Sequence, residues 1–228
     1  MTAPEMELEM EKAEKRYTVA EEIINSVSHG VGAMLGVAAL VLCIVVALLY
    51  GDGYSLAGGI IFGISLIVMY SMSALYHAFT NEKVKKIFRI FDHNSIFLLI
   101  AGTYTPFCLV SLMEYNPVLA WTLFGITWGM GILSIVLNSI DLKKFKVFSF
   151  ISYIVVGWLI IIVINPLRTA IAPAGIWLLV AGGITYTVGI IFYVLKKVRF
   201  MHCIWHFFVL AGSILHFLAI LLYVLPNN

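Results

Sequence analysis

The stretch VGAMLGVAALVLCIVVALLY, residues 31–50, contains no charged side chain. A helix of about 20 apolar residues can cross the roughly 30 Å hydrocarbon core of a bilayer, and its backbone groups are satisfied within the helix. Comparable runs recur along the chain, which is 62% hydrophobic and 11% charged, with a mean hydropathy of +1.02. A soluble domain of 228 residues has too little interior to bury so much apolar surface. We therefore predict an all-α membrane protein, a seven-transmembrane helix bundle with spans at residues 28–50, 54–79, 92–112, 117–138, 146–164, 171–195 and 202–225.

Prolines mark the least regular boundary, between the fifth and sixth spans. Asn165-Pro166 is predicted to break the fifth helix, because proline lacks a backbone donor and clashes with the preceding turn. Pro173 is predicted to lie near the first turn of the sixth helix.

Basic residues predict the orientation of the bundle. All but one of the 14 lie before the first span or on alternate connections, and only Arg168 lies on the other set. Since Lys and Arg accumulate on cytoplasmic connections, we predict a cytoplasmic N-terminus and an outside C-terminus. The residues on the predicted cytoplasmic side are Lys12, Lys15, Arg16, Lys83, Lys85, Lys86, Arg89, Lys143, Lys144, Lys146, Lys196, Lys197 and Arg199.

The chain is predicted to have two parts. Residues 1–18 form a polar, Glu-rich cytoplasmic tail, and residues 19–228 form the seven-transmembrane domain. The net charge of +2 is explained by topology and anionic headgroups, and no basic cluster of the kind that binds nucleic acid remains. Membrane lipids, and no nucleic acid, are therefore the expected partners, and the oligomeric state stays open.

Two other classes of seven-helix protein are disfavoured. A rhodopsin-like receptor has its N-terminus outside, and a retinal protein needs a lysine deep in its last helix, where this chain has none. An ion-coupled transporter usually carries ionisable groups near the midplane, and only His216 is ionisable and deep within a span.

Three histidines are predicted to meet at the cytoplasmic ends of two helices. His202 and His206 are four residues apart, so they share one helix face, about 6 Å apart along the axis. Alone, such a pair often marks only the headgroup level. His77 ends the second span at the same depth, and three imidazoles match the ligand set of catalytic zinc. We predict zinc bound by His77, His202 and His206.

Two further residues are the candidate catalytic groups. Asp92 abuts the third span at the same depth and has two interpretations: a cap of that helix, or a hydrogen-bond acceptor or general base beside the metal. Ser73 lies one turn before His77 on the same face. Its hydroxyl can orient a water or substrate oxygen, or bond back to a helix carbonyl.

Other polar residues flank this cluster. Glu22, Asn25 and His29 are spaced three and four apart, and they can form a second layer that fixes the tautomers of the ligands. They can equally form an interfacial polar face, which is our default interpretation for Glu22. His93 is predicted to face away from the partner of Asp92. His216 is predicted to lie about 15 Å deeper than His206, too far to share the ion.

Five short blocks of the sequence are informative together: Asn25 with Ser28-His29-Gly30, Ser73-Ala74-Leu75-Tyr76-His77, Phe91-Asp92-His93, Gly102-Thr103-Tyr104-Thr105-Pro106, and His202 with His206. In their order and spacing they resemble the hemolysin III branch of the progestin and adiponectin receptor family, over about residues 20–225. The resemblance implies seven helices with a cytoplasmic N-terminus. It implies zinc bound by His77, His202 and His206, with Asp92 and Ser73 near the water on that ion. The wider superfamily includes ceramidases and is proposed to hydrolyse lipid amide bonds.

Two functional hypotheses follow. The first is a zinc-dependent, ceramidase-like hydrolase of a lipid amide or ester at the cytoplasmic leaflet, in the plasma membrane of a bacterium. The second is a membrane-perturbing, cytolytic or lipid-sensing protein in which zinc is structural, although so apolar a chain does not travel through water unaided. A receptor for a protein hormone is disfavoured, because the outer connections at residues 51–53 and 114–116 are very short.

Overall fold

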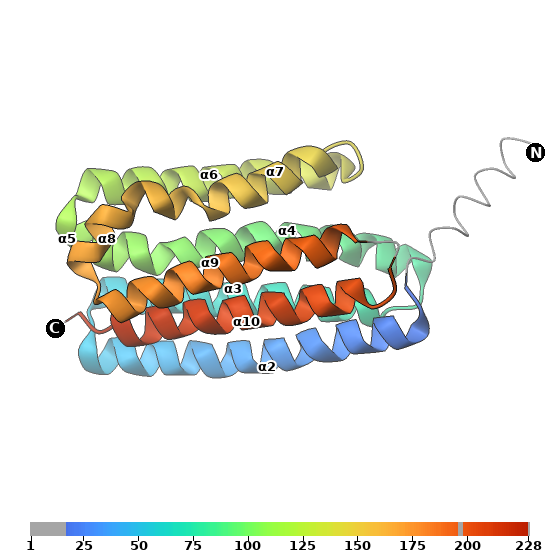
Figure 1. Ribbon diagram of the computed structural model, residues 1–228, viewed down its shortest axis with the longest axis horizontal. Coiled ribbons are helices and arrows are strands. Elements are labelled where there is room, and N and C mark those ends of the chain that lie inside the picture. Colours follow the sequence, from blue (N-terminus) through green and yellow to red (C-terminus); the bar gives the residue numbers. More distant parts are fainter. Residues whose placement is uncertain (1–16, 196–197, 228) are drawn as a thin grey trace, which may run out of the picture.

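The computed structural model describes residues 17–195 and 198–227, and within these ranges the chain is helical with no strand. These residues contain seven helical segments long and apolar enough to cross a membrane, which confirms the predicted seven-helix bundle (Figure 1). Five of the segments are single helices, and the other two each consist of three consecutive elements. The elements are α2 (Val19–Tyr50), α3 (Gly53–Ala78), α4 (Glu82–Pro106) continued by η1 (Phe107–Leu112) and α5 (Met113–Tyr115), α6 (Pro117–Asp141), α7 (Lys146–Gly157) continued by η2 (Leu159–Val163) and α8 (Ile164–Ala170), α9 (Pro173–Val194) and α10 (Met201–Tyr223).

Two helices begin well before the apolar runs that predicted them. Helix α2 begins at Val19 because Thr18 and Glu21 form a capping box, and α4 begins at Glu82 because the Asn81 side chain accepts from two backbone donors. Both helices therefore start before the predicted spans, which begin at residues 28 and 92. Capped polar turns stay helical although their composition does not suit hydrocarbon, so both helices extend beyond the membrane core.

The fifth span is irregular at a different place from the one predicted. Asn165-Pro166 does not break it, because Pro166 lies in the first turn of α8, where a missing backbone donor is tolerated. The irregularity lies at Trp158 (φ −100°, ψ 4°), which leads into the 3₁₀ segment η2. Pro173 is the first residue of α9, as predicted.

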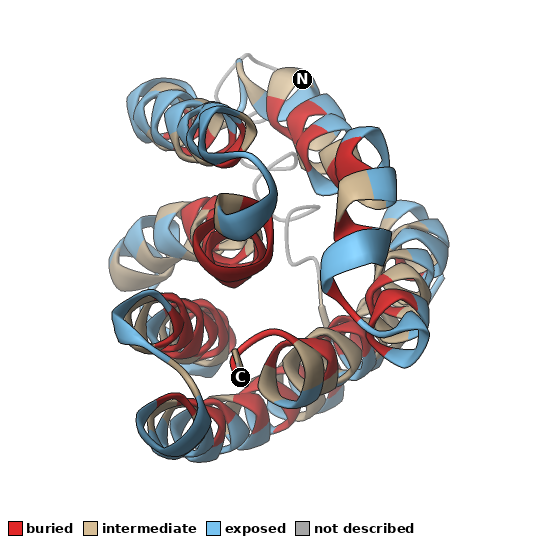
Figure 2. Ribbon diagram, turned by 90° about the vertical axis from the view of Figure 1, so that its left-hand side faces the viewer, coloured by how far each residue is buried: buried red, intermediate tan, exposed pale blue. Residues whose placement is uncertain are grey.

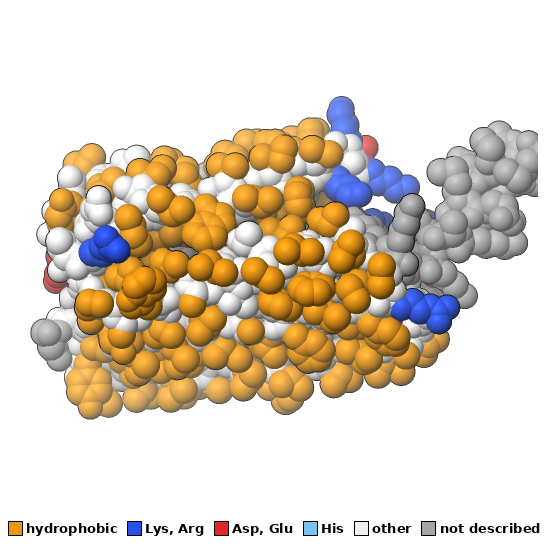
Figure 3. Space-filling view, viewed as in Figure 1, with side chains coloured by type: hydrophobic (Ala, Val, Ile, Leu, Met, Phe, Trp, Pro, Cys, Tyr) orange, Lys and Arg blue, Asp and Glu red, His pale blue; other side chains and the backbone are white. Residues whose placement is uncertain are grey.

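Helix α4 runs through the middle of the bundle. In its most apolar 18-residue window 78% of the residues are buried, against 28–50% in the other six spans. Figure 2 shows those other helices with buried residues turned inward and exposed residues turned outward. The outward faces are apolar along the length of the molecule (Figure 3), as expected for a surface that meets lipid.

The helices that carry the site pack closely. Helix α3 packs extensively on both α2 and α4, and α10 packs on α9 and α2. Gly32 of α2 lies against the buried ring of Tyr70, where a Cβ would collide with it. The Tyr70 hydroxyl in turn donates to Ser213 Oγ at 2.7 Å, which ties α3 to α10.

Charged residues lie at the two ends of the bundle. On the face shown in Figure 3, Lys and Arg gather at the end where α2 begins, and Arg168 lies near the opposite end, in the last turn of α8. This pattern agrees with the predicted orientation, which stays a prediction. Residues 1–16 of the predicted tail, including Lys12, Lys15 and Arg16, and also Lys196 and Lys197, lie outside the described residues.

Candidate metal centre

The structure brings the three predicted histidines together. His77 lies in the last turn of α3, and His202 and His206 lie in the first two turns of α10. Each offers one ring nitrogen, and these nitrogens lie within 4.8 Å of one another. His77 and His206 are buried, with exposed fractions of 3% and 2%. The short α9–α10 connection and the antiparallel course of the helices bring these turns to the same end of the bundle.

The His77 ring has a defined tautomer. Glu22 Oε2 accepts from His77 Nδ1 at 2.6 Å, so the Nδ1 atom carries the proton. The His77 Nε2 atom then presents a lone pair; it is buried and has no hydrogen-bond partner among the described residues. A histidine oriented by a carboxylate through one nitrogen is the usual arrangement of a metal ligand.

The His206 ring is oriented in a similar way. Ser28 Oγ donates to the Asn25 carbonyl at 3.0 Å, so its lone pairs can accept from His206 Nδ1, 3.5 Å away. The His206 Nε2 atom lies 3.1 Å from His202 Nε2. The Tyr17 ring stacks on the His202 ring with centroids 4.7 Å apart and fixes its plane.

These nitrogens fit a metal ion of the zinc type. Two nitrogens bound at about 2.0–2.1 Å to a tetrahedral ion lie about 3.3–3.4 Å apart. The 3.1 Å separation of the His202 and His206 nitrogens is close to this value, and the limit of 4.8 Å for the whole group leaves only a small adjustment of the rings. Among the described residues, this is the group that could hold a metal ion.

Glu22 links three helices at this site. Its second oxygen, Oε1, accepts from Lys85 Nζ of α4 at 2.6 Å, while Oε2 holds His77 of α3. The Glu22 side chain is 20% exposed. Our default interpretation of Glu22 as an interfacial residue is therefore wrong, and the alternative of a second layer behind the histidines describes its contacts.

Glu21 fixes the start of α10, and hence the position of His202. Its Oε1 atom accepts from the backbone N–H of Phe200 at 2.7 Å, and its other oxygen accepts from Thr18. Phe200 has φ 64°, a left-handed conformation that is unusual for a bulky residue. The buried carboxylate of Glu21 thus holds the turn that leads into the metal-site helix.

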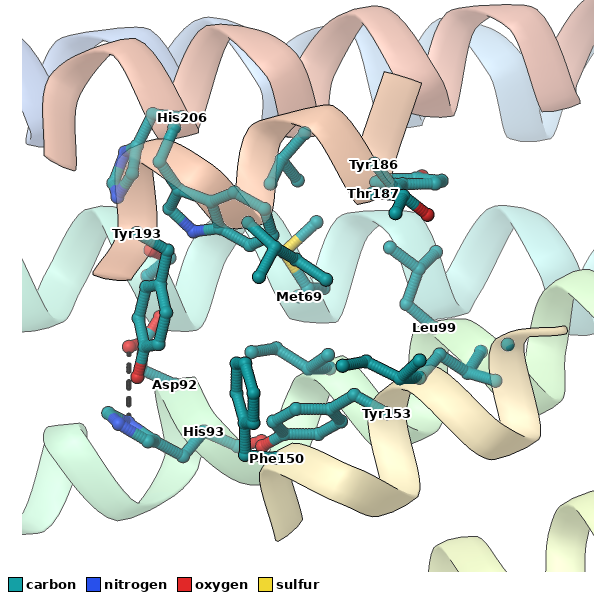
Figure 4. Close-up of a pocket in the computed structure, with 18 of the residues that line it drawn as sticks. Met69, Asp92, His93, Leu99, Phe150, Tyr153, Tyr186, Thr187, Tyr193 and His206 are labelled. Atoms are coloured by element: carbon teal, nitrogen blue, oxygen red, sulfur yellow. Dashed lines mark hydrogen bonds and ion pairs between the residues drawn. The ribbon is translucent and has the colours of Figure 1, made fainter. Parts of the chain in front are cut away.

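Asp92 and Ser73 lie beside the histidines. Asp92 is well inside α4, so the interpretation of Asp92 as a helix cap is wrong, and Asn81 has that role. The Asp92 side chain is 16% exposed, and the Ser73 hydroxyl lies beside its carboxylate. His93 lies beside Asp92: its Nδ1 atom donates to the Arg89 carbonyl at 2.8 Å and lies 3.5 Å from Asp92 Oδ2 (Figure 4). His93 is not part of the three-histidine group, in agreement with the prediction that it does not share the ion.

His29 makes ring contacts near the site that the sequence spacing did not predict. The His29 ring stacks on His206 with centroids 3.6 Å apart, and it meets the Tyr70 ring edge-on at 5.0 Å. His29 and Asn25 are buried, and their side-chain nitrogen and oxygen atoms have no hydrogen-bond partner among the described residues. The spacing from Glu22 indicated a common helix face, but it gave no sign of a stacked ring.

An elongated cavity extends from the histidines into the bundle. His206 and Asp92 lie at one end and Tyr186 at the other (Figure 4), and His202, Trp158 and His216 also line the cavity. Figure 4 shows Met69 between the two ends, Leu99 near the end with Tyr186, and Phe150 and Tyr153 along the wall formed by α7. The lining is mostly apolar and aromatic, as in pockets that take small apolar molecules.

Comparison with known proteins gives consistent matches. A family model described as "Haemolysin-III related" matches residues 17–217, which include every residue of the candidate metal centre. "Hemolysin-3" of Bacillus cereus is 44% identical over 209 residues, which cover 92% of this chain and 94% of that protein. "Hemolysin-3 homolog" of Bacillus subtilis (strain 168) is 44% identical over 207 residues, covering 91% and 96%. The human "Monocyte to macrophage differentiation factor" is 27% identical over 213 residues, covering 91% and 86%.

Proposed function

This chain belongs to the haemolysin-III related family, within the progestin and adiponectin receptor superfamily, and we propose that it is a zinc-dependent hydrolase of a lipid amide or ester at the cytoplasmic leaflet. One observation carries the proposal: three imidazoles that could hold a metal lie together, and two of them, His202 and His206, line an apolar cavity that Asp92 also lines. The apolar cavity suits the acyl chain of a lipid. The histidines and Asp92 suit the amide or ester bond at the end of that chain.

Zinc is the metal that this donor set favours. Three neutral imidazoles leave a fourth position open, which is the pattern of catalytic rather than structural zinc sites. Zinc, when bound, would polarise the carbonyl of the linkage and make water more acidic. Glu22 would hold the His77 ring as a ligand, because the proton on Nδ1 directs the Nε2 lone pair toward the ion.

Asp92 is proposed as the general base and acid. Its carboxylate would take a proton from the water whose oxygen adds to the carbonyl carbon. It would then return that proton to the nitrogen or oxygen that leaves when the C–N or C–O bond breaks. The Ser73 hydroxyl would orient the carboxylate by donating to it, and His93 Nδ1 lies 3.5 Å from Asp92 Oδ2.

The cavity would place the linkage at this end of the bundle. An acyl chain in the apolar part would leave its amide or ester at the histidines, which lie near the first turn of α10. Helices α7 and α9 form one wall, bridged by a hydrogen bond from Trp158 Nε1 to Thr187 Oγ1 at 3.1 Å. By the positive-inside rule this end faces the cytoplasm, and we propose the plasma membrane of a bacterium as the location.

Turnover of defined lipids tests the proposal. Purified protein in detergent or nanodiscs is expected to cleave one or more ceramide-like amides or acyl esters. A chelator is expected to abolish cleavage, and added zinc is expected to restore it, while helical circular dichroism stays unchanged. Protein that holds one zinc per chain but turns over no lipid amide or ester would contradict the hydrolase proposal.

Substitution of Glu22 tests how the site is built. The change Glu22→Gln is expected to lower zinc affinity by about 10–100-fold, because the amide cannot replace a charged acceptor for His77 Nδ1. The affinity can be measured by competition with a chromophoric chelator. Glu82→Gln, at an exposed position in the first turn of α4, is the matched control. Equal affinities in both variants would show that His77 needs no carboxylate to bind.

A cytolytic role is a second candidate, and one observation favours it. Two relatives, each 44% identical to this chain, are named "Hemolysin-3" and "Hemolysin-3 homolog". In this version zinc would be structural, and lysis would need no chemistry at Asp92. The two proposals therefore differ in what they expect of an Asp92 variant.

A further inference from the structure

His216 is an ionisable residue in the middle of a membrane-spanning helix. It lies ten residues beyond His206 on α10, which corresponds to about 15 Å along the helix axis. That distance is about half the thickness of the hydrocarbon core, so His216 lies near the midplane if His206 lies near the boundary. Ionisable groups at this depth are costly and usually serve a function. The proposed hydrolysis makes no use of His216.

The contacts of the His216 ring define its hydrogen-bonding character. Its Nε2 atom lies 3.1 Å from the Leu179 carbonyl oxygen, which can only accept, so Nε2 carries the proton. The Nδ1 atom is then a lone-pair acceptor; it is buried and has no hydrogen-bond partner among the described residues. Gly182 of α9 accommodates the ring, because a Cβ there would collide with it. His216 lines the cavity, so an acyl chain that enters the cavity would contact its ring.

Tyr186 provides a second polar group at this end of the cavity. Its ring lies edge-on to the His216 ring with centroids 5.3 Å apart, and it also lines the cavity. Its hydroxyl is 2.7 Å from Ser213 Oγ, which also accepts from the Tyr70 hydroxyl. A phenol hydroxyl can both donate and accept, so the bond with Ser213 occupies one of these two functions and leaves the other for a ligand.

We propose that His216 and Tyr186 form a subsite for a hydroxyl group on the acyl chain of the ligand. The hydroxyl would donate to His216 Nδ1, and its own oxygen would meet the Tyr186 hydroxyl. This inference rests on the proposed function, because it assumes that the head of the chain lies at the histidines of the metal centre. The separation of about 15 Å between His216 and His206 along α10 then corresponds to about a dozen carbon–carbon bonds of an extended acyl chain.

The direction of the hydrogen bond makes the proposal specific. Because Nδ1 is an acceptor, a hydroxyl satisfies it, whereas a ketone at the same carbon brings a second acceptor and leaves Nδ1 unsatisfied. The subsite should therefore distinguish a hydroxylated chain from both a plain chain and a keto chain of the same length.

Binding of three matched fatty acids tests the subsite without requiring catalysis. The probes are an eighteen-carbon saturated fatty acid and the same acid with a hydroxyl or a ketone at about the twelfth carbon. Each competes with a fluorescent fatty acid for the purified protein in nanodiscs. We expect the hydroxylated chain to bind about three- to tenfold more tightly than the plain chain, which corresponds to one net hydrogen bond. The keto chain is expected to bind less tightly than the hydroxylated chain, because its oxygen can accept from Tyr186 but cannot donate to His216 Nδ1.

Two variants and a control assign the preference to the subsite. His216→Leu and Tyr186→Phe are each expected to reduce the hydroxyl preference to less than twofold, while binding of the plain chain changes little. Tyr186→Phe keeps the ring in place, so it serves if His216→Leu fails to fold. Thr185→Val is the matched control on α9, because the Thr185 hydroxyl bonds to the Ala181 carbonyl of its own helix, outside the cavity lining. It is expected to keep the preference.

The outcomes separate this inference from the proposed function. Equal binding of plain and hydroxylated chains by the wild type, or an undiminished preference in both variants, would overturn the subsite and leave the hydrolase proposal intact. A hydroxyl preference in a protein that cleaves no lipid would support the subsite and contradict the hydrolase. Binding of none of the three chains would overturn the lipid cavity on which both depend.

Discussion

Asp92→Asn is expected to lower lipid hydrolysis by about 100- to 10,000-fold, the usual contribution of a positioned general acid or base. Asparagine has nearly the same shape as aspartate and can still contact His93, but it cannot accept a proton from water. Metal content is expected to stay at the wild-type level, because Asp92 lies outside the three-histidine group. Initial rates on a fluorogenic amide and zinc analysis of the same samples measure both effects.

The same substitution at a distant carboxylate provides the control. Asp141 ends α6, where its side chain accepts from the backbone N–H groups of Lys143 and Lys144, and it does not line the cavity. Asp141→Asn is expected to hydrolyse lipid at the wild-type rate. An Asp92→Asn protein that keeps more than about a tenth of the activity would show that proton transfer does not depend on this carboxylate.

Lysis of red cells or vesicles by Asp92→Asn protein separates the two functional candidates. If lysis and hydrolysis fall together while metal is retained, lysis results from chemistry on lipid. Lysis that is unchanged while hydrolysis is lost would favour membrane disruption with a structural metal.

His206→Ala is expected to lower zinc affinity on the order of 100-fold or more. Losing even a residue that only orients a ligand weakens metal binding by about 10–100-fold, so losing a ligand should weaken it at least as much. His206 is also 2% exposed, so alanine leaves a cavity beneath His29. His206→Gln keeps most of the volume and isolates the loss of the ligand nitrogen from the packing defect. Metal content after dialysis against a weak chelator measures the effect.

His216→Leu is the matched control for this prediction. It removes a second, half-buried histidine from the same helix, at a position outside the metal group. Zinc content equal to the wild type is expected. Loss of zinc in His216→Leu, or retention of zinc in His206→Gln, would mean that the metal lies elsewhere in the chain.

The seven spans and the meeting of the histidines could be predicted from the sequence. Apolar runs long enough to cross a bilayer are a strong signal, since backbone groups in lipid leave few alternatives. Counting spans then places the end of the second helix and the start of the seventh on the same side. His77, His202 and His206 therefore had to lie at one depth, and the structure adds that their ring nitrogens approach each other.

The residues around the histidines are placed by contacts between helices, which the spacing of residues within one helix does not predict. Glu22 and His29 lie on one face of α2, but only packing of α2 on α3 and α10 brings Glu22 to His77 and the His29 ring onto His206. The sequence predicted that a span begins at Asp92, because the residues before it are polar and charged and the apolar run begins after it. The cap at Asn81 extends α4 by three turns beyond the apolar run and turns Asp92 into an interior residue.

X-ray absorption at the zinc K-edge of the purified protein tests the central claim most directly. If one ion is held by His77, His202 and His206, the spectrum should fit three imidazole nitrogens at about 2.0–2.1 Å with one further light atom. A single imidazole, or a sulfur ligand at about 2.3 Å such as Cys203 would supply, would contradict the three-histidine centre.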